Sequence, residues 1–223
     1  MNNWDFSVIP KYFTSFLPYA WMTVQVTVFG LLIGLVLGLG FALLRLSKLK
    51  ILNYPAKAYI WAIRGTPLLL QLLFIYFGLV TIVVIDKIPA ACIALGIHNG
   101  AYIAEIFRGS IQSVDRGQRE AGLSLGMTSG KIMKNIILPQ AFKRAVPPLG
   151  NQFIIALKDS SLASAISVGE LLLHARQLGS SQYQLMEMLT IAAIYYLFMT
   201  TVLTVISNLV EKKLKVSDNK STI

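Results

Sequence analysis

The 223-residue sequence predicts an all-α integral membrane protein with five transmembrane helices. Hydrophobic residues make up 55% of the chain, charged residues make up only 13%, and the mean hydropathy is +0.64. A soluble domain of this length does not need so apolar a composition. The apolar stretches are also long enough, because a helix needs roughly 20 residues to cross about 30 Å of hydrocarbon.

These stretches are continuously apolar, as in LLLQLLFIYFGLV, whereas the strands of a membrane β-barrel alternate in polarity. A helical bundle is therefore the predicted architecture. The five expected spans cover residues 18–44, 67–85, 88–107, 146–173 and 187–209.

The distribution of lysine and arginine predicts the orientation, because these residues concentrate in cytoplasmic loops. Basic residues follow the first, third and fifth spans: Arg45, Lys48, Lys50 and Lys57; Arg108, Arg116, Arg119, Lys131, Lys134, Lys143 and Arg144; Lys212, Lys213, Lys215 and Lys220. The opposite side has only Lys11, Lys87 and Arg176. We expect the amino terminus outside and the carboxyl terminus inside, as an odd number of spans requires.

The net charge of +10 is explained by this topology and by contact with anionic membrane lipid, so we expect no nucleic-acid partner. The single cysteine, Cys92, excludes an internal disulfide and a cysteine metal cluster, and no metal site is expected.

The amino-terminal residues lack the basic region of a cleavable signal peptide. Their aromatic residues predict an interfacial segment on the outer leaflet: Trp4, Phe6, Tyr12, Phe13 and Phe16. The first span then follows.

Residues 51–65 are too interrupted by polar residues to cross, so we expect a helix near the inner interface. Thr66 and Pro67 predict the start of the second span, with the threonine side chain as its cap. Arg64 then lies at the cytoplasmic boundary, either as a donor near the inner gate or as an arginine that reaches lipid phosphates.

One face of the third span carries small and polar residues at helical spacing, which indicates the bundle interior. These residues are Ala91, Ala94, His98, Tyr102, Glu105 and Gly109.

The fourth span is expected to open at Pro147 and Pro148 and to place Lys158 and Asp159 near the bilayer centre. A charge there costs about 2.5 to 3.5 kcal/mol, so both side chains need a partner, water or a solute. Adjacent helical residues do not face each other, which argues against a simple pair between them. His98 and Asn99 are expected at a similar depth, and this gathering of polar groups predicts a solute pathway.

The basic loop of residues 115–144 predicts a helix, a turn at Gly126 and a second helix that ends at Pro139. Its apolar positions are too many for a solvated linker, so the bundle or a partner should cover part of it.

The spacing of Glu120, Ala121, Gly126, Leu138 and Pro139 resembles the EAA loop of ATP-binding cassette importer permeases. The segments at 64–78, 101–121 and 138–164 resemble the polar amino acid branch of these permeases, so the resemblance covers nearly the whole chain. One departure is Gly122, where the family usually has a second alanine, a change that costs about 1 kcal/mol of helix propensity.

The resemblance implies a type I importer permease fold, with residues 1–223 as a single transmembrane domain in the bacterial cytoplasmic membrane. It implies two cytoplasmic ATPase subunits, a second permease subunit, identical or different, and an extracytoplasmic binding protein that delivers an amino acid. The chain would bind no cofactor, since ATP and magnesium belong to the ATPase and no GxxxxGK[ST] motif occurs in this sequence. The residues assigned to ATPase coupling are Glu120, Ala121, Ser124, Leu125, Gly126, Met127 and Thr128.

A zwitterionic amino acid needs an acid for its ammonium group and donors for its carboxylate. Glu105 or Asp159 would supply the acid. The remaining candidate substrate-binding residues are Asn99, Tyr102, Lys158 and Ser160. In the alternative interpretation, Glu105 and Asp159 hold helices together or line the subunit interface, and the binding protein alone sets specificity.

Other classes of protein fit less well. A transporter driven by an ion gradient leaves the EAA spacing unexplained, and an intramembrane serine hydrolase lacks a nucleophile signature. A purely structural protein would not place Lys158 and Asp159 near the membrane centre.

Overall fold

The structure, a computed structural model, describes residues 4–47 and 49–214, and within these ranges all regular elements are helical. Lys48, Lys215 and Lys220 of the charge count lie outside the described residues. The amino-terminal elements are η1 (Phe6–Val8), α1 (Ile9–Phe13), η2 (Thr14–Phe16) and α2 (Leu17–Leu46). Next come α3 (Lys50–Arg64), α4 (Leu68–Leu73), η3 (Phe74–Gly78), α5 (Lys87–Gln112), α6 (Arg116–Ser124) and α7 (Ser129–Ile132). The last are η4 (Met133–Ile137), α8 (Leu138–Asp159), η5 (Ser160–Ile166), α9 (Leu171–Gln182) and α10 (Leu185–Lys213).

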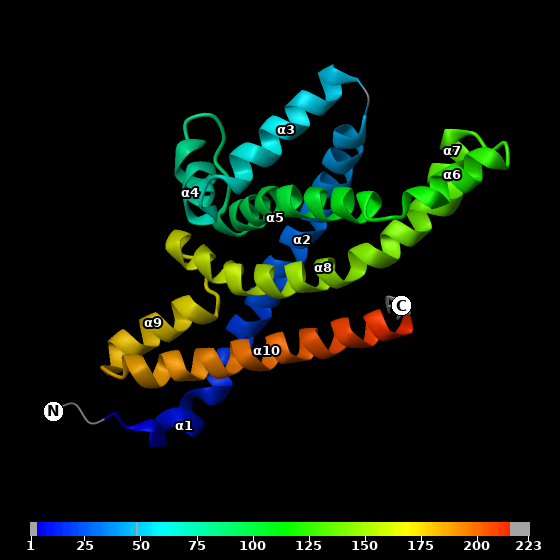
Figure 1. Cartoon of the computed structure of the whole chain (residues 1–223). Coiled ribbons are helices and arrows are strands. Elements are labelled where there is room, and N and C mark those ends of the chain that lie inside the picture. Colours follow the sequence, from blue (N-terminus) through cyan, green and yellow to red (C-terminus); the bar gives the residue numbers. More distant parts are fainter. Residues whose placement is uncertain (1–3, 48, 215–223) are drawn as a thin grey trace.

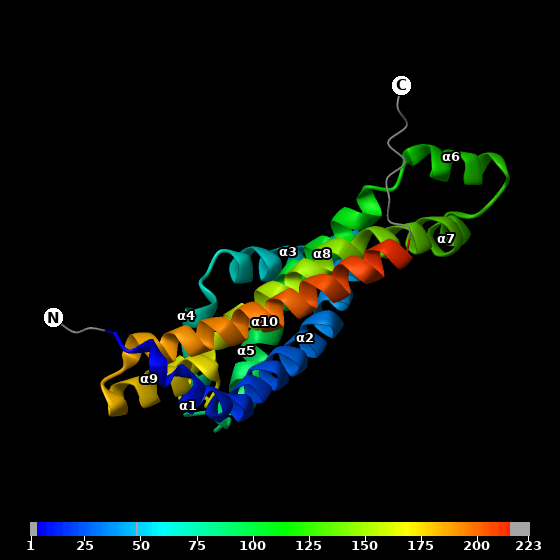
Figure 2. The ribbon, with the colours of Figure 1, turned by 90° about the horizontal axis from the view of Figure 1, so that it is seen from below.

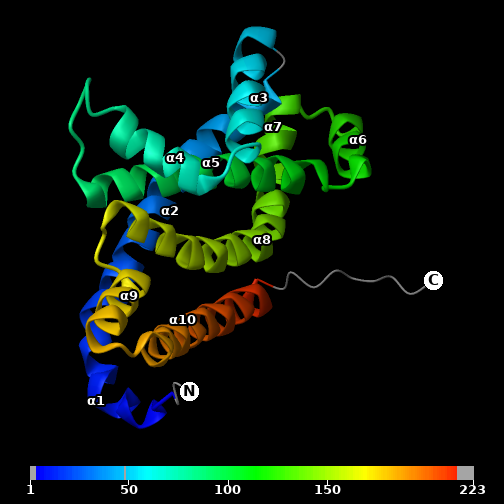
Figure 3. The same cartoon turned by 90° about the vertical axis from the view of Figure 1, so that its left-hand side faces the viewer.

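The long helices α2, α5, α8 and α10 form an elongated bundle with two distinct ends (Figures 1 and 2). Helices α1 and α9 lie at one end, and α6, α7 and the carboxyl end of α10 lie at the other. Figure 3 shows the same separation from another side, with α3 and the α6–α7 hairpin far from α1.

Three helical stretches in the described part of the chain are long and apolar enough to cross a membrane: Phe6–Leu46, Lys87–Gln112 and Leu185–Lys213. A fourth crossing is available if Lys50–Arg64 and Leu68–Gly78, which meet at 105°, form one broken span. The predicted all-α membrane bundle is confirmed.

The second predicted span starts within one residue of α4, but its far end and its predicted cap are wrong. Its helix stops at Gly78, because the six residues from 80 to 85 are all β-branched and disfavour a helix. Thr66 does not cap it either. The Thr66 hydroxyl donates to the Ala62 carbonyl at the end of α3, and Pro67 precedes the first residue of α4.

The fourth predicted span is also wrong in its bounds. The helix does not end at Pro139, which lies in the first turn of α8, where a missing N–H is tolerated. Pro147 and Pro148 lie inside α8 rather than opening it, and the helix is bent (Figure 1).

The helix ends at Asp159 rather than at residue 173, because serine hydroxyls compete for the last carbonyls. Ser160 donates to Leu157 O at 2.8 Å and Ser161 donates to Lys158 O at 2.7 Å. Ser167 then adopts a left-handed conformation with φ of 61°, which separates η5 from α9.

The aromatic residues before α2 divide into two groups. Trp4 and Phe6 are exposed, as an interfacial segment requires. Phe16 is fully buried and Phe13 stacks on Tyr195 of α10 at 4.8 Å, so these two pack into the bundle instead of facing lipid.

Candidate functional site

Close packing of α5 against α2 positions the polar face of α5. Gly30, Gly34 and Gly38 of α2 lie against α5, and Gly96 and Gly100 of α5 lie against α2. A Cβ on Gly38 would come within 2.5 Å of Ile103 Cγ2, and one on Gly96 would come within 2.5 Å of Ile33 Cγ2. Small residues four apart let the two backbones approach, as in other membrane helix pairs.

Asn99 lies on this helix and is fully buried. Its amide nitrogen donates to Leu95 O at 2.7 Å, and its amide oxygen accepts from Gln152 Nε2 of α8 at 2.7 Å. The Asn99 amide is therefore engaged within the protein and joins α5 to α8.

His98 is buried next to Asn99 and lies 3.1 Å from Gln71 Oε1 of α4. The amide nitrogen of the same Gln71 donates to Ile63 O at 2.8 Å and to the Thr66 hydroxyl at 2.9 Å. Gln71 thus satisfies a carbonyl at the end of α3 and fixes the bend between α3 and α4.

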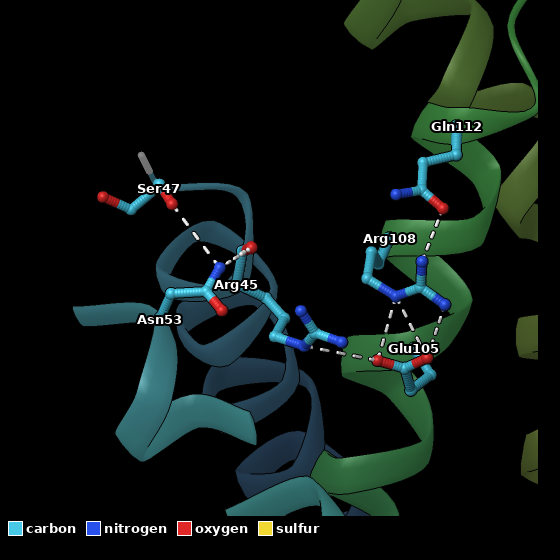
Figure 4. A network of polar contacts seen from close by, with 6 residues as sticks. All are labelled: Arg45, Ser47, Asn53, Glu105, Arg108 and Gln112. Atoms are coloured by element: carbon cyan, nitrogen blue, oxygen red, sulfur yellow. Dashed lines mark hydrogen bonds and ion pairs between the residues drawn. The ribbon is translucent and has the colours of Figure 1, made fainter. Parts of the chain in front are cut away.

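Glu105 lies two turns further along α5 and pairs within its own helix (Figure 4). Arg108 donates to its two carboxylate oxygens at 3.0, 3.0 and 2.7 Å, and Arg108 also bonds Gln112. Arg45 of α2 approaches from the other side, with its Nε 4.0 Å from Glu105 Oε1. The carboxylate is thus held chiefly by Arg108.

Tyr102 is half-buried between His98 and Glu105 on the same face. Its ring centroid lies 5.0 Å from that of His98, and the Arg64 guanidinium carbon lies 5.1 Å from it. The ring thereby links the middle of α5 to the end of α3.

Lys158, Asp159 and Ser160 lie where α8 ends and η5 begins. Lys158 is exposed, Asp159 is half-buried, and Ser160 is buried with its hydroxyl donated to the Leu157 carbonyl. Among the described residues, neither charged side chain takes part in an ion pair within 4.0 Å.

The structure therefore divides the six predicted substrate residues into two groups. Asn99, Tyr102 and Glu105 follow one face of α5, and Lys158, Asp159 and Ser160 follow one another at the end of α8. No hydrogen bond joins the two groups directly in the described ranges, and the Asn99–Gln152 bond is the polar link between their helices at this depth.

The predicted coupling loop forms two helices joined by a tight turn, α6 and α7, at one end of the bundle (Figure 1). Gly126 has φ of +71°. Its N–H bonds Leu123 O at 2.9 Å, and Met127 N–H bonds Gly122 O at 3.0 Å. This pair of bonds is the Schellman motif, which satisfies the carbonyls at the end of α6.

The other coupling residues surround this turn. Thr128 caps α7 by accepting from Lys131 N, and Ser124 bonds back to Glu120 O at 3.1 Å. Glu120, Ala121, Ser124, Leu125 and Thr128 are exposed, and Met127 is half-buried.

The apolar residues of the hairpin fall into two sets. Val114, Ile132, Ile137 and Ala141 form a small core with Met127 and Ile136 packed against it. Leu123 and Leu125 remain 51% and 81% exposed. The first set stabilises the hairpin itself, and the second is left uncovered by the described residues.

Gly122 is buried against this small core. A Cβ at this position would lie 2.8 Å from Ile132 Cγ1 and 3.1 Å from Ile132 Cδ1. Glycine at position 122 therefore leaves room for the Ile132 side chain, which an alanine Cβ would crowd. Helix α6 forms despite the glycine.

Sequence reasoning missed several residues that position the site: Gln71, Gln152, Arg108 and the glycines shared by α2 and α5. Two signals were present. The glycines recur every four residues at 30, 34 and 38 and at 96 and 100, and Arg108 follows Glu105 by three. The partners of Gln71 and Gln152 depend on the fold, and no local pattern indicates them.

Comparison with known proteins agrees with this arrangement. A model of the family described as "Binding-protein-dependent transport system inner membrane component" matches residues 30–216. The chain is 38% identical to the arginine transport system permease protein ArtQ of Bacillus subtilis, over 97% of this chain and 100% of the relative. It is 40% identical to the glutamine transport system permease protein GlnP of Escherichia coli, over 87% and 90%.

Solved structures give the same result. A crystal structure of an amino acid ABC transporter with histidines matches with a TM-score of 0.91 and 41% identity, covering 96% of this chain and 100% of that one. An inward-facing MetNI methionine ABC transporter matches at 20% identity with a TM-score of 0.75, covering 89% and 95%, which supports the fold alone.

Proposed function

The chain belongs to the family of inner membrane components of binding-protein-dependent transport systems, and we propose that it is the permease subunit of an ATP-binding cassette importer for polar amino acids. The observation that carries this function is the α6–α7 hairpin. It is stabilised by its own core, closed by the Gly126 turn, and exposes Leu123 and Leu125 at one end of a membrane bundle. Such a hairpin can receive the movement of a soluble partner and transmit it to α5 and α8, which flank it.

The proposed partners are two ATPase subunits at the hairpin, a second permease subunit, and an extracytoplasmic binding protein. ATP and magnesium would bind to the ATPase, and family membership supports a permease without a nucleotide site of its own. ATP hydrolysis by the separate subunit then drives alternating access of the helices.

The proposed topology has five crossings in the bacterial cytoplasmic membrane, with the amino terminus outside. The crossings are α2, the segment that starts with α4 and η3, α5, α8 and α10, with α3, which meets α4 at 105°, near the inner interface. Two observations support it: the basic residues around α6 and α7, and the separation of that hairpin from α1 and α9.

Within the candidate substrate site we propose distinct roles for the two groups. Lys158 and Asp159 would contact the charged groups of the amino acid, because each is accessible or half-buried and has no ion-pair partner among the described residues. Asn99, Glu105 and Ser160 would fix the surrounding helices, because each is already hydrogen-bonded within the protein. Tyr102 would line the path between the two groups.

The function is tested by purifying the chain from membranes with its nucleotide-binding subunit and measuring ATP hydrolysis. We expect co-purification, and hydrolysis that rises when the binding protein and an amino acid are added. Uptake by the isolated chain without an ATPase would contradict the importer function.

The site is tested by amino acid uptake in reconstituted vesicles. Asp159→Asn should weaken uptake or alter substrate preference, whereas Glu105→Gln should lower thermal stability and leave the preference unchanged. Unaltered uptake and preference in Asp159→Asn would remove Asp159 from the site.

A further inference from the structure

A basic pocket of about 470 Å³ opens between the carboxyl end of α2, the second half of α3 and α5. Its charged lining residues are Arg45, Lys57, Arg64 and Glu105, with Trp61 at its edge. We call this the basic pocket. It is separate from Lys158 and Asp159, which lie at the end of α8.

The basic pocket has a surplus of positive charge. Three of its side chains are cations and one is a carboxylate. That carboxylate, Glu105, already accepts three hydrogen bonds from Arg108, which is not itself part of the lining. Arg45 also pairs with it at 4.0 Å, so this one carboxylate is shared by two guanidinium groups and cannot neutralise the three lining cations.

The cations also have free hydrogen-bond donors. The Nε atom of Arg45 is buried, and no hydrogen-bond partner for it lies within the described residues. Figure 4 shows its side chain extending from α2 toward Glu105 on α5. Arg64 and Lys57 lie over the rings of Tyr102 and Tyr54, at 5.1 and 5.5 Å, and such contacts leave their N–H groups available. Leaving a buried donor unpaired is costly, so an acceptor in the basic pocket would be stabilising.

The surroundings point to the headgroup region of a membrane. Trp61 is 80% exposed and Tyr54 is 60% exposed on α3, close to Lys57 and Arg64. Tryptophan, tyrosine and basic residues concentrate where hydrocarbon meets water. A guanidinium fork matches phosphate oxygens, and each basic residue near an anionic membrane contributes about 1 kcal/mol.

We propose that Arg45, Lys57 and Arg64 form a binding site for a phosphate group, with the headgroup of an anionic phospholipid as the source that the position of the pocket favours. Arg45 lies in the last turn of α2, and Glu105 lies about two turns before the end of α5, which leads into α6, so under the topology proposed above the lipid belongs to the inner leaflet. A bound headgroup would tie α2, α3 and α5 together next to the hairpin.

Trp61 provides a reporter for the test. The full chain is reconstituted with Trp4→Phe and Trp21→Phe, so that Trp61 is the remaining tryptophan of three. Its fluorescence is then quenched with brominated phosphatidylglycerol or with brominated phosphatidylcholine. We expect phosphatidylglycerol to associate more strongly. Arg45→Gln or Arg64→Gln should each reduce this preference about fivefold, as loss of about 1 kcal/mol requires.

Lys50→Gln is the matched control, because it removes the same charge from α3 outside the pocket lining, and it should keep the preference. If Arg45→Gln does not fold, Arg64→Gln with Lys57→Gln tests the same site, since neither Arg64 nor Lys57 forms an ion pair in the described residues. Equal quenching by the two lipids, or a preference that these variants leave intact, would overturn the proposal.

Competition separates the possible sources of phosphate. If inorganic phosphate or glycerol phosphate relieves the quenching and chloride at the same ionic strength does not, the site binds a soluble phosphate. No relief by either assigns it to the lipid. Relief by an amino acid but by neither phosphate would overturn the proposal and make the pocket part of the transport path.

Discussion

The Glu105 carboxylate accepts three hydrogen bonds from the Arg108 guanidinium, one turn further along α5. A pair at this spacing needs little more than the helix itself, and it keeps the negative charge from standing alone at the edge of the bundle. Asn99 is satisfied in another way, by a backbone carbonyl of its own helix and by Gln152 of α8. Polar residues such as Glu105 and Asn99 are therefore satisfied within the protein. Residues with unsatisfied polar groups are the ones available to bind a ligand.

Gly126 is the glycine with a positive φ among the described residues. Its φ of +71° is disfavoured for side chains with a Cβ, although a Cβ there would contact nothing within 4 Å. Gly126→Ala should therefore destabilise the hairpin by about 1 kcal/mol, and Gly126→Asn should cost less because asparagine tolerates this conformation. Binding of the ATPase subunit and its hydrolysis rate are the measurements.

Gly130→Ala is the control for this change. Its Cβ would also contact nothing within 4 Å, and Gly130 lies in α7 without a positive φ. Alanine in a helix is favoured over glycine by about 1 kcal/mol, so this variant should keep or improve binding. Equal losses in both variants would show that the turn conformation is not the cause.

At the scale of the elements, α2 and α5 form the pair that holds the site. Gly38 faces Ile103 at a hypothetical Cβ distance of 2.5 Å, whereas a Cβ on Gly40 of the same helix would meet nothing within 4 Å. Gly38→Val should lower stability by about 1 to 3 kcal/mol through overpacking, and Gly40→Val should have little effect. Thermal unfolding of the full chain in detergent measures both, and matching melting temperatures would contradict the close packing.

The contact between α6 and the segment after it leads to a coupled prediction. Gly122→Ala gains about 1 kcal/mol of helix propensity but places its Cβ 2.8 Å from Ile132 Cγ1. We expect the single variant to weaken the hairpin. Ile132→Ala should cost less in the Gly122→Ala background than in the unchanged chain, because it removes the clashing atoms. A double-mutant cycle of unfolding free energies measures this, and strict additivity would contradict it.

The elements also show which features the sequence could predict. Long apolar helices such as α5 and α10 were predicted within a few residues, because hydrophobic length alone specifies them. The Gly126 turn was predicted because glycine readily adopts the left-handed conformation that ends a helix. The far end of the second span and both ends of the fourth span were not predicted. They depend on a run of β-branched residues after Gly78, on serine hydroxyls that bond the last carbonyls of α8, and on prolines that α8 tolerates. The roles of Gln71 and Gln152 arise from tertiary contacts that no single segment contains.

At the scale of the whole molecule, the proposed topology places α1 and α9 outside and α6 inside. Cys92 is the single cysteine and is buried, so a Cys92→Ala chain offers a background for cysteine labelling. Ser7, Ser124 and Ser181 are exposed and lie at η1, α6 and α9. A membrane-impermeant maleimide applied to intact cells should label Ser7→Cys and Ser181→Cys, and should label Ser124→Cys only after the membrane is opened.

Each position decides a different part of this topology. Helix α8 separates Ser124 from Ser181, so labelling of both from outside would mean that α8 does not cross, and the five-crossing topology would be wrong. Helix α10 follows Ser181 and ends in Lys212 and Lys213, and its crossing puts those lysines on the inner side, where basic residues concentrate. If only Ser124→Cys is labelled in intact cells, the orientation of the molecule is the reverse of the proposed one. The hairpin would then lie outside, where a cytoplasmic ATPase cannot bind it. The same three variants therefore test the orientation of the bundle and the access of the partner that drives it.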